Sequence, residues 1–314
     1  MAVGDIITAN NYNAVQNRVE AILGNGSGTE GYGETTASNN VAVDDIIYAN
    51  DLNALYTDFD KIYRHQVNSS PAGSLAIPAV EDLIAWDTSD NPDGVLKGWQ
   101  DYIDFMALVE ADPQRFALHP TQSTSNNNVA TLTRTAQWNT NLNGYYRATF
   151  ASEDARRHFF NSGGSITFEV NLVSTASGGN INKTNDWATM LSNSGTVSFN
   201  YNSTASDNSG TGSAIGNYQL TNSEQQLYRK TGSGVYADNN YYIRARNISA
   251  TVIEFRIWMN EADTGSTSTA KGVVPIDEYV QGNLTHQIGF VRASGVYVDV
   301  NAPTIVRHSN FAGS

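Results

Sequence analysis

The chain has 314 residues, which is enough for two or three domains of ordinary size. Its formal net charge of −13 argues against nucleic-acid binding, and its lack of cysteine excludes disulfides, thiol catalysis and cysteine-bound metals. Only 16% of the residues are charged, so solubility has to come from uncharged polar side chains, as in many secreted, surface or virion β-proteins. No stretch approaches the ~18 apolar residues of a membrane helix, and no signal-peptide pattern opens the chain, so we expect neither.

The first feature in chain order is a repeat, because residues 2–14 return as residues 42–54. In each copy a strand-like segment precedes apolar positions spaced 3, 4 and 3, a spacing that lines one face of a helix. Asn10 and Asn50 are predicted to cap the two helices. The apolar positions of the strand-like segments and helices are Ile6, Ile7, Tyr12, Val15, Val19 and Ile22, and then Ile46, Ile47, Leu52, Leu55, Phe59 and Ile62.

This repeat predicts an attachment and oligomerisation region over residues 1–65. Narrow apolar stripes fit a seam between helices better than a broad core face, so we expect these apolar residues to form the interface of a homo-oligomer, with a trimer favoured. The alternative is that the two short helices pack on each other within one chain, and the sequence leaves both arrangements open.

Residues 66–120 are predicted to form a helical connector. A short helix is expected over residues 79–86. A second is expected over 98–111, where Trp99, Tyr102, Met106 and Val109 follow helical spacing. The polar run over residues 121–128 predicts a linker between the two halves of the chain.

Residues 129–314 are predicted to form a β-rich, sandwich-like domain. In residues 165–172 apolar side chains alternate with polar ones, the pattern of a half-buried antiparallel strand. Further strands are expected over residues 130–132, 145–150, 197–201, 241–246, 251–259, 286–290 and 295–300. The predicted fold class is therefore α+β: a helical N-terminal region with a twice-used strand–helix repeat, followed by a mostly antiparallel β-sandwich or jelly-roll-like domain.

One helix interrupts these strands. Glu153 and Asp154 suit the positive end of a helix dipole, and the pair Gly163-Gly164 is suited to end the helix. The run from Ala151 to Ile166, ASEDARRHFFNSGGSI, resembles a stretch in structural proteins of tailed bacteriophages. Residues 4–19, GDIITANNYNAVQNRV, are similar to the starts of phage tail, baseplate or fibre proteins. The resemblance implies a virion component and brings no catalytic residues.

The residues that could carry chemistry all have simpler explanations. The chain has no Gly-x-Ser-x-Gly elbow and no paired His motif, so we expect no catalytic residue, no metal site and no cofactor. Carboxylate pairs suitable for glycoside hydrolysis are Asp101 with Asp104, Glu153 with Asp154, and Asp277 with Glu278. Acidic turns at Asp207 and Asp238 could hold Ca²⁺, but their spacing favours solvated turns.

Aromatic side chains are the remaining candidates for binding. Tyr145-Tyr146 and Tyr241-Tyr242 lie in expected strands, so one member of each pair should point inward and the other outward. Trp187 lies in a polar, loop-like stretch and is the best single candidate for an exposed contact with a glycan or a protein.

These features favour a non-enzymatic structural protein of a phage virion, from the tail, baseplate, neck or fibre apparatus. Its repeats would dock on other virion proteins, and its β domain would project. The alternatives are a glycan-binding adhesin module for host recognition and, less favoured, a glycan depolymerase. No nucleic-acid partner and no membrane insertion are expected.

Overall fold

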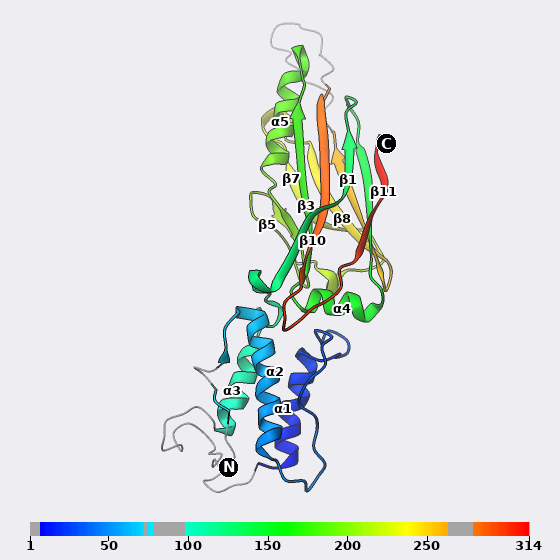
Figure 1. Cartoon of the computed structure of the whole chain (residues 1–314). Helices are drawn as coiled ribbons and strands as arrows, with labels where there is room; N and C mark the ends of the chain where they lie inside the picture. Colours follow the sequence, from blue (N-terminus) through cyan, green and yellow to red (C-terminus); the bar gives the residue numbers. More distant parts are fainter. Residues whose placement is uncertain (1–6, 72–74, 78–97, 263–278, 314) are drawn as a thin grey trace. The chain divides into compact units, whose positions relative to one another are not determined.

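The computed structural model describes residues 7–71, 75–77, 98–262 and 279–313, and the chain divides into two compact units (Figure 1). Unit 1 contains residues 1–124, 154–164 and 292–301, and unit 2 contains residues 125–153, 165–291 and 302–314. Residues 1–65 and 66–120, predicted as separate regions, both fall in unit 1. That unit also takes two segments from the expected β region.

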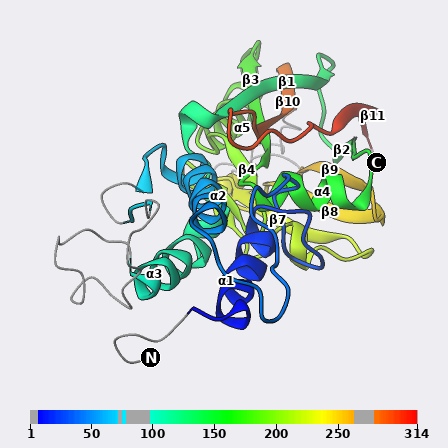
Figure 2. The same ribbon diagram turned by 60° about the horizontal axis from the view of Figure 1, so that its bottom comes forward.

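Three helices that lie next to one another form the core of unit 1: α1 (Ala9–Ile22), α2 (Ala49–Val67) and α3 (Trp99–Glu110) (Figure 2). The ring centroids of Tyr12 and Trp99 lie 6.5 Å apart, and those of Phe59 and Phe105 lie 5.5 Å apart. The predicted oligomer seam is therefore wrong for the helices, because α3 supplies large rings that cover both stripes within one chain. The stripe residues are at most 2% exposed: Tyr12, Val15, Val19, Ile22, Leu52, Leu55, Phe59 and Ile62.

The two helices also begin differently from the prediction. Thr8 caps α1, since its hydroxyl accepts a hydrogen bond from the backbone N–H of Asn11 at 3.3 Å. At α2 the carboxylate of Asp51 accepts a hydrogen bond from the backbone N–H of Tyr48 at 2.8 Å. Asn10 and Asn50 lie inside the first helical turns, so the predicted asparagine caps are wrong.

The run of residues 151–166 contains helix α4 (Glu153–Asn161), and residues 154–161 of this helix pack in unit 1. Arg157 donates to the carbonyl oxygen of Asn25 at 2.9 Å, and the amide of Asn161 donates to the carbonyl oxygens of Thr29 and Gly31 at 3.1 Å each. Gly163 has a φ of 83° and ends the helix as predicted. These contacts give the run a structural role, fixing the loop that follows α1.

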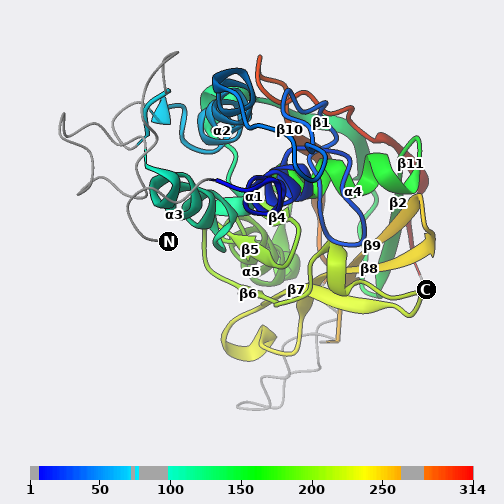
Figure 3. The same cartoon turned by 90° about the horizontal axis from the view of Figure 1, so that it is seen from below.

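Unit 2 is a sandwich of two antiparallel sheets, which confirms the predicted α+β class. The five-stranded sheet has the order β1 (Ser123–Arg134), β10 (Gly282–Ala293), β3 (Ser165–Ser174), β4 (Val197–Phe199) and β5 (Thr204–Ser206). The six-stranded sheet has the order β11 (Thr304–Gly313), β2 (Leu142–Thr149), β9 (Val252–Asn260), β8 (Asn240–Ser249), β7 (Gln225–Thr231) and β6 (Thr211–Gly212). Figure 3 shows β2, β9, β8 and β7 following one another. Short 3-10 helices are η3 (Gln114–Phe116), η4 (Pro120–Gln122), η5 (Gly178–Asn180), η6 (Asn217–Gln219) and η7 (Gly234–Tyr236).

Aromatic side chains from both sheets meet in the core of the sandwich. The ring centroid of Phe255 on β9 lies 5.1 Å from that of Phe168 on β3 and 5.6 Å from that of Phe199 on β4. Tyr146 and Tyr241 point inward and are fully buried, while their neighbours Tyr145 and Tyr242 are half-buried on the other side. This alternation confirms the prediction for the two tyrosine pairs.

Several local predictions fail in instructive ways. The expected linker over residues 121–128 runs through η4 into β1. Residues 295–300, expected as a strand, belong to unit 1 and carry only an isolated bridge between Ser294 and Asp299. Helix α5 (Ile181–Ser192) occupies a stretch expected as a loop. The helix expected over 79–86 lies outside the described residues.

Candidate functional site

Trp187, the predicted exposed aromatic, is fully buried on α5, so that prediction is wrong. Its indole Nε1–H donates to Glu261 at 2.8 Å, and the ammonium of Lys183 lies 3.1 Å from the other oxygen of the same carboxylate. Both charged side chains are almost completely removed from water. A buried charge has to be paired and hydrogen-bonded, and the indole and the ammonium meet that need for Glu261. Trp187 is therefore a structural residue.

A second buried polar cluster lies between the two sheets around His286 of β10. The hydroxyl of Tyr146 donates to the carbonyl oxygen of His286 at 2.6 Å, and the hydroxyl of Tyr241 lies 2.9 Å from its Nε2 atom. Burial lowers the pKa of His286 to about 3, so the imidazole stays neutral at physiological pH. The cluster links β10 to β2 and β8 by hydrogen bonds across the sandwich, so its role is to stabilise the core.

Of the apolar residues predicted for attachment, those in the second strand-like segment remain available on the surface. Ile46 is 68% exposed and Ile47 is half-buried, and Val43 and Tyr48 are also exposed, with the charged Asp44 and Asp45 between Val43 and Ile46; residues 43–48 are called the exposed apolar segment for these three apolar side chains. Ile7 is half-buried, and Ile6 lies outside the described residues. The repeat thus divides into buried helices and one exposed segment, residues 43–48.

The carboxylates considered for chemistry are spread over the chain. Asp101 accepts a hydrogen bond from the backbone N–H of Gly98, and Asp154 pairs with Arg157 on α4. Asp207 accepts from the backbone N–H of Thr196 in a turn, and the pair Asp277–Glu278 falls outside the described residues. Within the described part of the chain, no three His, Asp or Glu side chains are grouped to hold a metal ion.

A different set of residues forms a surface with binding character on the outer side of the six-stranded sheet. On β8 and β9 every second side chain points away from the core, and the strand register sets them in three rows. We call this set the arginine–aromatic face; it consists of Arg147, Glu224, Arg229, Tyr242, Arg244, Arg246, Glu254, Arg256 and Trp258.

The first row centres on a stacked pair of rings. Tyr242 and Trp258 face each other across β8 and β9 with ring centroids 4.9 Å apart and planes inclined by 22°. The guanidinium of Arg244 lies 4.5 Å from the Trp258 ring centroid and 5.1 Å from that of Tyr242. Arg256 lies 4.9 Å from the Trp258 ring and Arg229 5.8 Å from the Tyr242 ring. The rings hold the cations in place because their faces carry negative quadrupole charge.

Two glutamates order the remaining rows. Glu224 accepts from Arg244 at 3.0 Å and from Arg256 at 3.1 Å. Glu254 accepts from Arg246 at 2.7 Å and from Arg147 at 2.9 Å. Burial opposes ionisation of Glu254, but these arginine hydrogen bonds outweigh it and hold the pKa of Glu254 below its usual range. Five arginines against two glutamates leave three positive charges on this face, in a chain whose net charge is −13.

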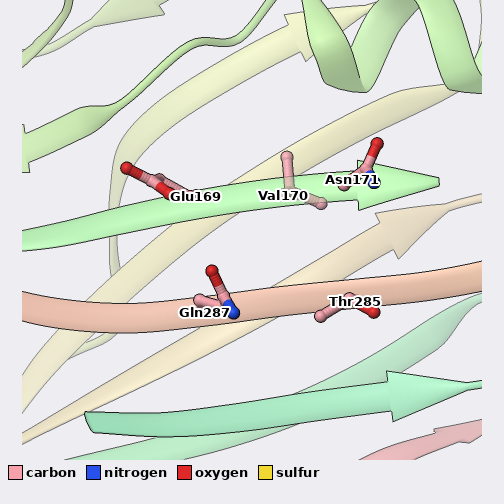
Figure 4. Close-up of a pocket in the computed structure, with 5 residues that line it drawn as sticks. All are labelled: Glu169, Val170, Asn171, Thr285 and Gln287. Carbon is pink, nitrogen blue, oxygen red and sulfur yellow. The ribbon is translucent and has the colours of Figure 1, made fainter. Parts of the chain in front are cut away.

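The opposite sheet carries a shallow polar pocket of about 250 Å³ (Figure 4). It lies between β3 and β10, where Glu169 pairs in register with Gln287, and Asn171 with Thr285. Thr196 donates to Glu169 at 3.1 Å, which leaves that carboxylate engaged within the fold. The pocket lining contains no aromatic ring and no cation, so it has weaker binding character than the arginine–aromatic face.

Comparisons with family models, with curated proteins and with solved structures find no match to this chain. None of the helices in the described part of the chain is long and apolar enough to cross a membrane.

Proposed function

We propose that the protein is a non-enzymatic structural component of a tailed-phage virion, from the tail, baseplate, neck or fibre apparatus. In this proposal unit 1 attaches to other virion proteins and unit 2 carries a recognition surface. The proposal starts from the two sequence runs that resemble phage proteins. In the structure Arg157 of the second run donates to the carbonyl oxygens of Asn25 and Gly26, in the loop that follows α1, and α1 contains most of the first run.

The observation that carries the recognition role is the arginine–aromatic face. Arginine, tyrosine and tryptophan are the residue types enriched at binding hot spots. On this face their side chains are already held in place in the free protein by ring stacking and by a shared carboxylate. Preorganised side chains lose less conformational entropy on binding. This observation also favours the second candidate function, an adhesin module that binds a host surface glycan.

The attachment role is assigned to the exposed apolar segment of residues 43–48, since the helical stripes are used inside unit 1. The homo-oligomer expected from the sequence, with a trimer favoured, is proposed to use this segment instead of the helical stripes. Light scattering on the purified full chain measures the oligomeric state directly.

The test of the proposal is whether the chain is part of purified particles. Particles banded on a density gradient should contain it at a fixed ratio to the major structural proteins, measured by quantitative mass spectrometry. Its absence from particles, with free protein left in the lysate, would contradict the proposal. The triple variant Val43→Ser, Ile46→Ser, Tyr48→Ser should fold but fail to enter particles. Val296→Ser, at another exposed apolar position of unit 1, is the control for loss of an exposed apolar side chain outside the segment.

A further inference from the structure

We infer that the arginine–aromatic face binds an anionic saccharide, so that its ligand carries carboxylate or phosphate groups on a sugar chain. This inference rests on the recognition role given to unit 2 under the proposed function.

The charge pattern of the face sets the class of ligand. Each row keeps one uncompensated cation: Arg229 in the first row, one of Arg244 and Arg256 in the second, and one of Arg246 and Arg147 in the third. Rows two residues apart along a strand repeat at ~7 Å. The face therefore presents three positive charges in a line, while the rest of the chain sums to −16 when these three are removed from −13. The local positive charge of this face attracts a negatively charged ligand.

The position of the guanidinium groups separates an anionic sugar from a neutral one. A neutral sugar binds largely by stacking on an open aromatic face, but here Arg244 lies over both rings and Arg256 over Trp258. The first groups that a ligand meets are therefore guanidinium forks, which match carboxylate and phosphate oxygens in a bidentate way.

The size of the face separates a saccharide from an acidic protein. Four strands, β7 to β2 in the sheet order, span ~14 Å across, and the rows from Tyr242 to Arg246 span ~14 Å along the strand, which gives ~200 Å². A stable protein–protein interface buries ~800 Å² on each partner. The area suits a saccharide of a few residues.

Two donors within the face lack an acceptor among the described residues. The indole Nε1 of Trp258 and the Nε of Arg244 are both buried under neighbouring side chains without a hydrogen-bond partner. A buried N–H without an acceptor is unfavourable. A ligand oxygen that displaces the flexible end of an arginine would satisfy these donors, so the face gains from an anionic partner.

The experiment uses the purified full chain and isothermal titration, with no particles involved. The probes are tetragalacturonate for carboxylates, pentamannose phosphate for phosphates, maltotetraose as the neutral sugar and a short polyglutamate as the acidic polypeptide. The test variant is Arg244→Gln with Arg256→Gln. Arg307→Gln removes one positive charge from an exposed side chain on β11 of the same sheet, outside the face, and serves as the control for loss of an exposed arginine.

The wild-type protein and Arg307→Gln should bind at least one anionic saccharide and not maltotetraose, and binding should weaken when salt is raised. The double variant should lose about tenfold or more in affinity. Thermal unfolding of each variant shows whether the fold is kept. Preference between the uronate and phosphate probes identifies the anionic group. Binding to neither, equal binding to maltotetraose, tighter binding to polyglutamate, or unchanged binding in the folded double variant would overturn the inference. None of these results depends on whether the chain enters virions.

Discussion

The buried histidine of the sandwich should make unit 2 lose stability in mild acid. In the unfolded chain His286 titrates near the ordinary pKa of 6.5, whereas burial lowers its pKa to about 3 in the folded protein. Below pH 6.5 the unfolded state therefore binds a proton that the folded state does not. The stability that the folded state gains from the neutral imidazole is fully present above pH 6.5 and is lost as the pH falls from 6.5 towards 3.

The size of this effect follows from the lowered pKa of His286. Each pH unit below 6.5, down to about pH 3, lowers the free energy of unfolding by about 1.4 kcal/mol for this one group. From pH 7 to pH 5 His286 should lower the free energy of unfolding by about 2 kcal/mol. Urea unfolding of the full chain at both pH values, for the wild type and for His286→Gln, isolates this part, since all carboxylates are common to both proteins. The variant should be less stable at pH 7 but should lose about 2 kcal/mol less on acidification. Equal losses in the two proteins would refute the account of His286 as a neutral core residue.

Three further predictions concern packing and backbone. Phe59→Ala should lower the stability of unit 1 by about 3–5 kcal/mol by opening a cavity against α3, while the exposed Tyr48→Ala should change it by less than about 0.5 kcal/mol, as measured by helical circular dichroism on urea titration. Lys183→Met should cost about 3–5 kcal/mol because it strands the Glu261 carboxylate, and adding Glu261→Gln should recover part of the loss; no recovery would argue against the ion pair. Gly163→Ala should destabilise more than Gly178→Ala. Both glycines have a positive φ, which an alanine adopts at a cost of about 1–2 kcal/mol in stability. Only at Gly163 would the new Cβ also clash, because it would lie 2.6 Å from the Cβ of Leu118, whereas no atom lies within 4 Å at Gly178.

The elements with regular hydrophobic periodicity were predicted correctly from the sequence. The 3-4-3 stripes predict α1 and α2, and the strict alternation over residues 165–172 predicts β3. What the stripes pack against was not readable, because the covering rings of Trp99 and Phe105 are contributed by α3, some forty residues downstream of Phe59. An amphipathic face shows that something covers it and does not show whether that is the same chain or another.

Helix α5 was missed because its apolar positions are few and lie among Asn, Lys and Asp. Thr184, Trp187 and Leu191 do follow helical spacing, and this weak signal would have placed Trp187 on a buried face. Lys183 made the buried face of α5 harder to predict, because a lysine is expected to be exposed unless a charged partner is known. Its partner Glu261 lies 78 residues away in sequence.

The arginine–aromatic face was only half visible in the sequence. The alternation predicted that one of Tyr241 and Tyr242 points outward without deciding which, and in the structure Arg244, Trp258 and Arg256 share the parity of Tyr242 within their strands. Their convergence depends on the register between β8 and β9, in which Tyr242 pairs with Trp258 and Arg244 with Arg256. A register shift of one residue would turn every side chain of one strand to the other side, so register has to come from the structure.

The most direct test of the recognition surface is the indole resonance of Trp258 in a ¹⁵N-correlated nuclear magnetic resonance spectrum. Trp258 and Trp138 both have a buried indole N–H that finds no acceptor in the part of the chain that the structure describes, but only Trp258 belongs to the arginine–aromatic face. On titration with the anionic saccharide that binds, the Trp258 signal should move as ligand oxygens approach its N–H, while the Trp138 signal stays in place. A ligand that binds without moving the Trp258 signal, or that moves the Trp138 signal instead, would contradict the assignment of this face.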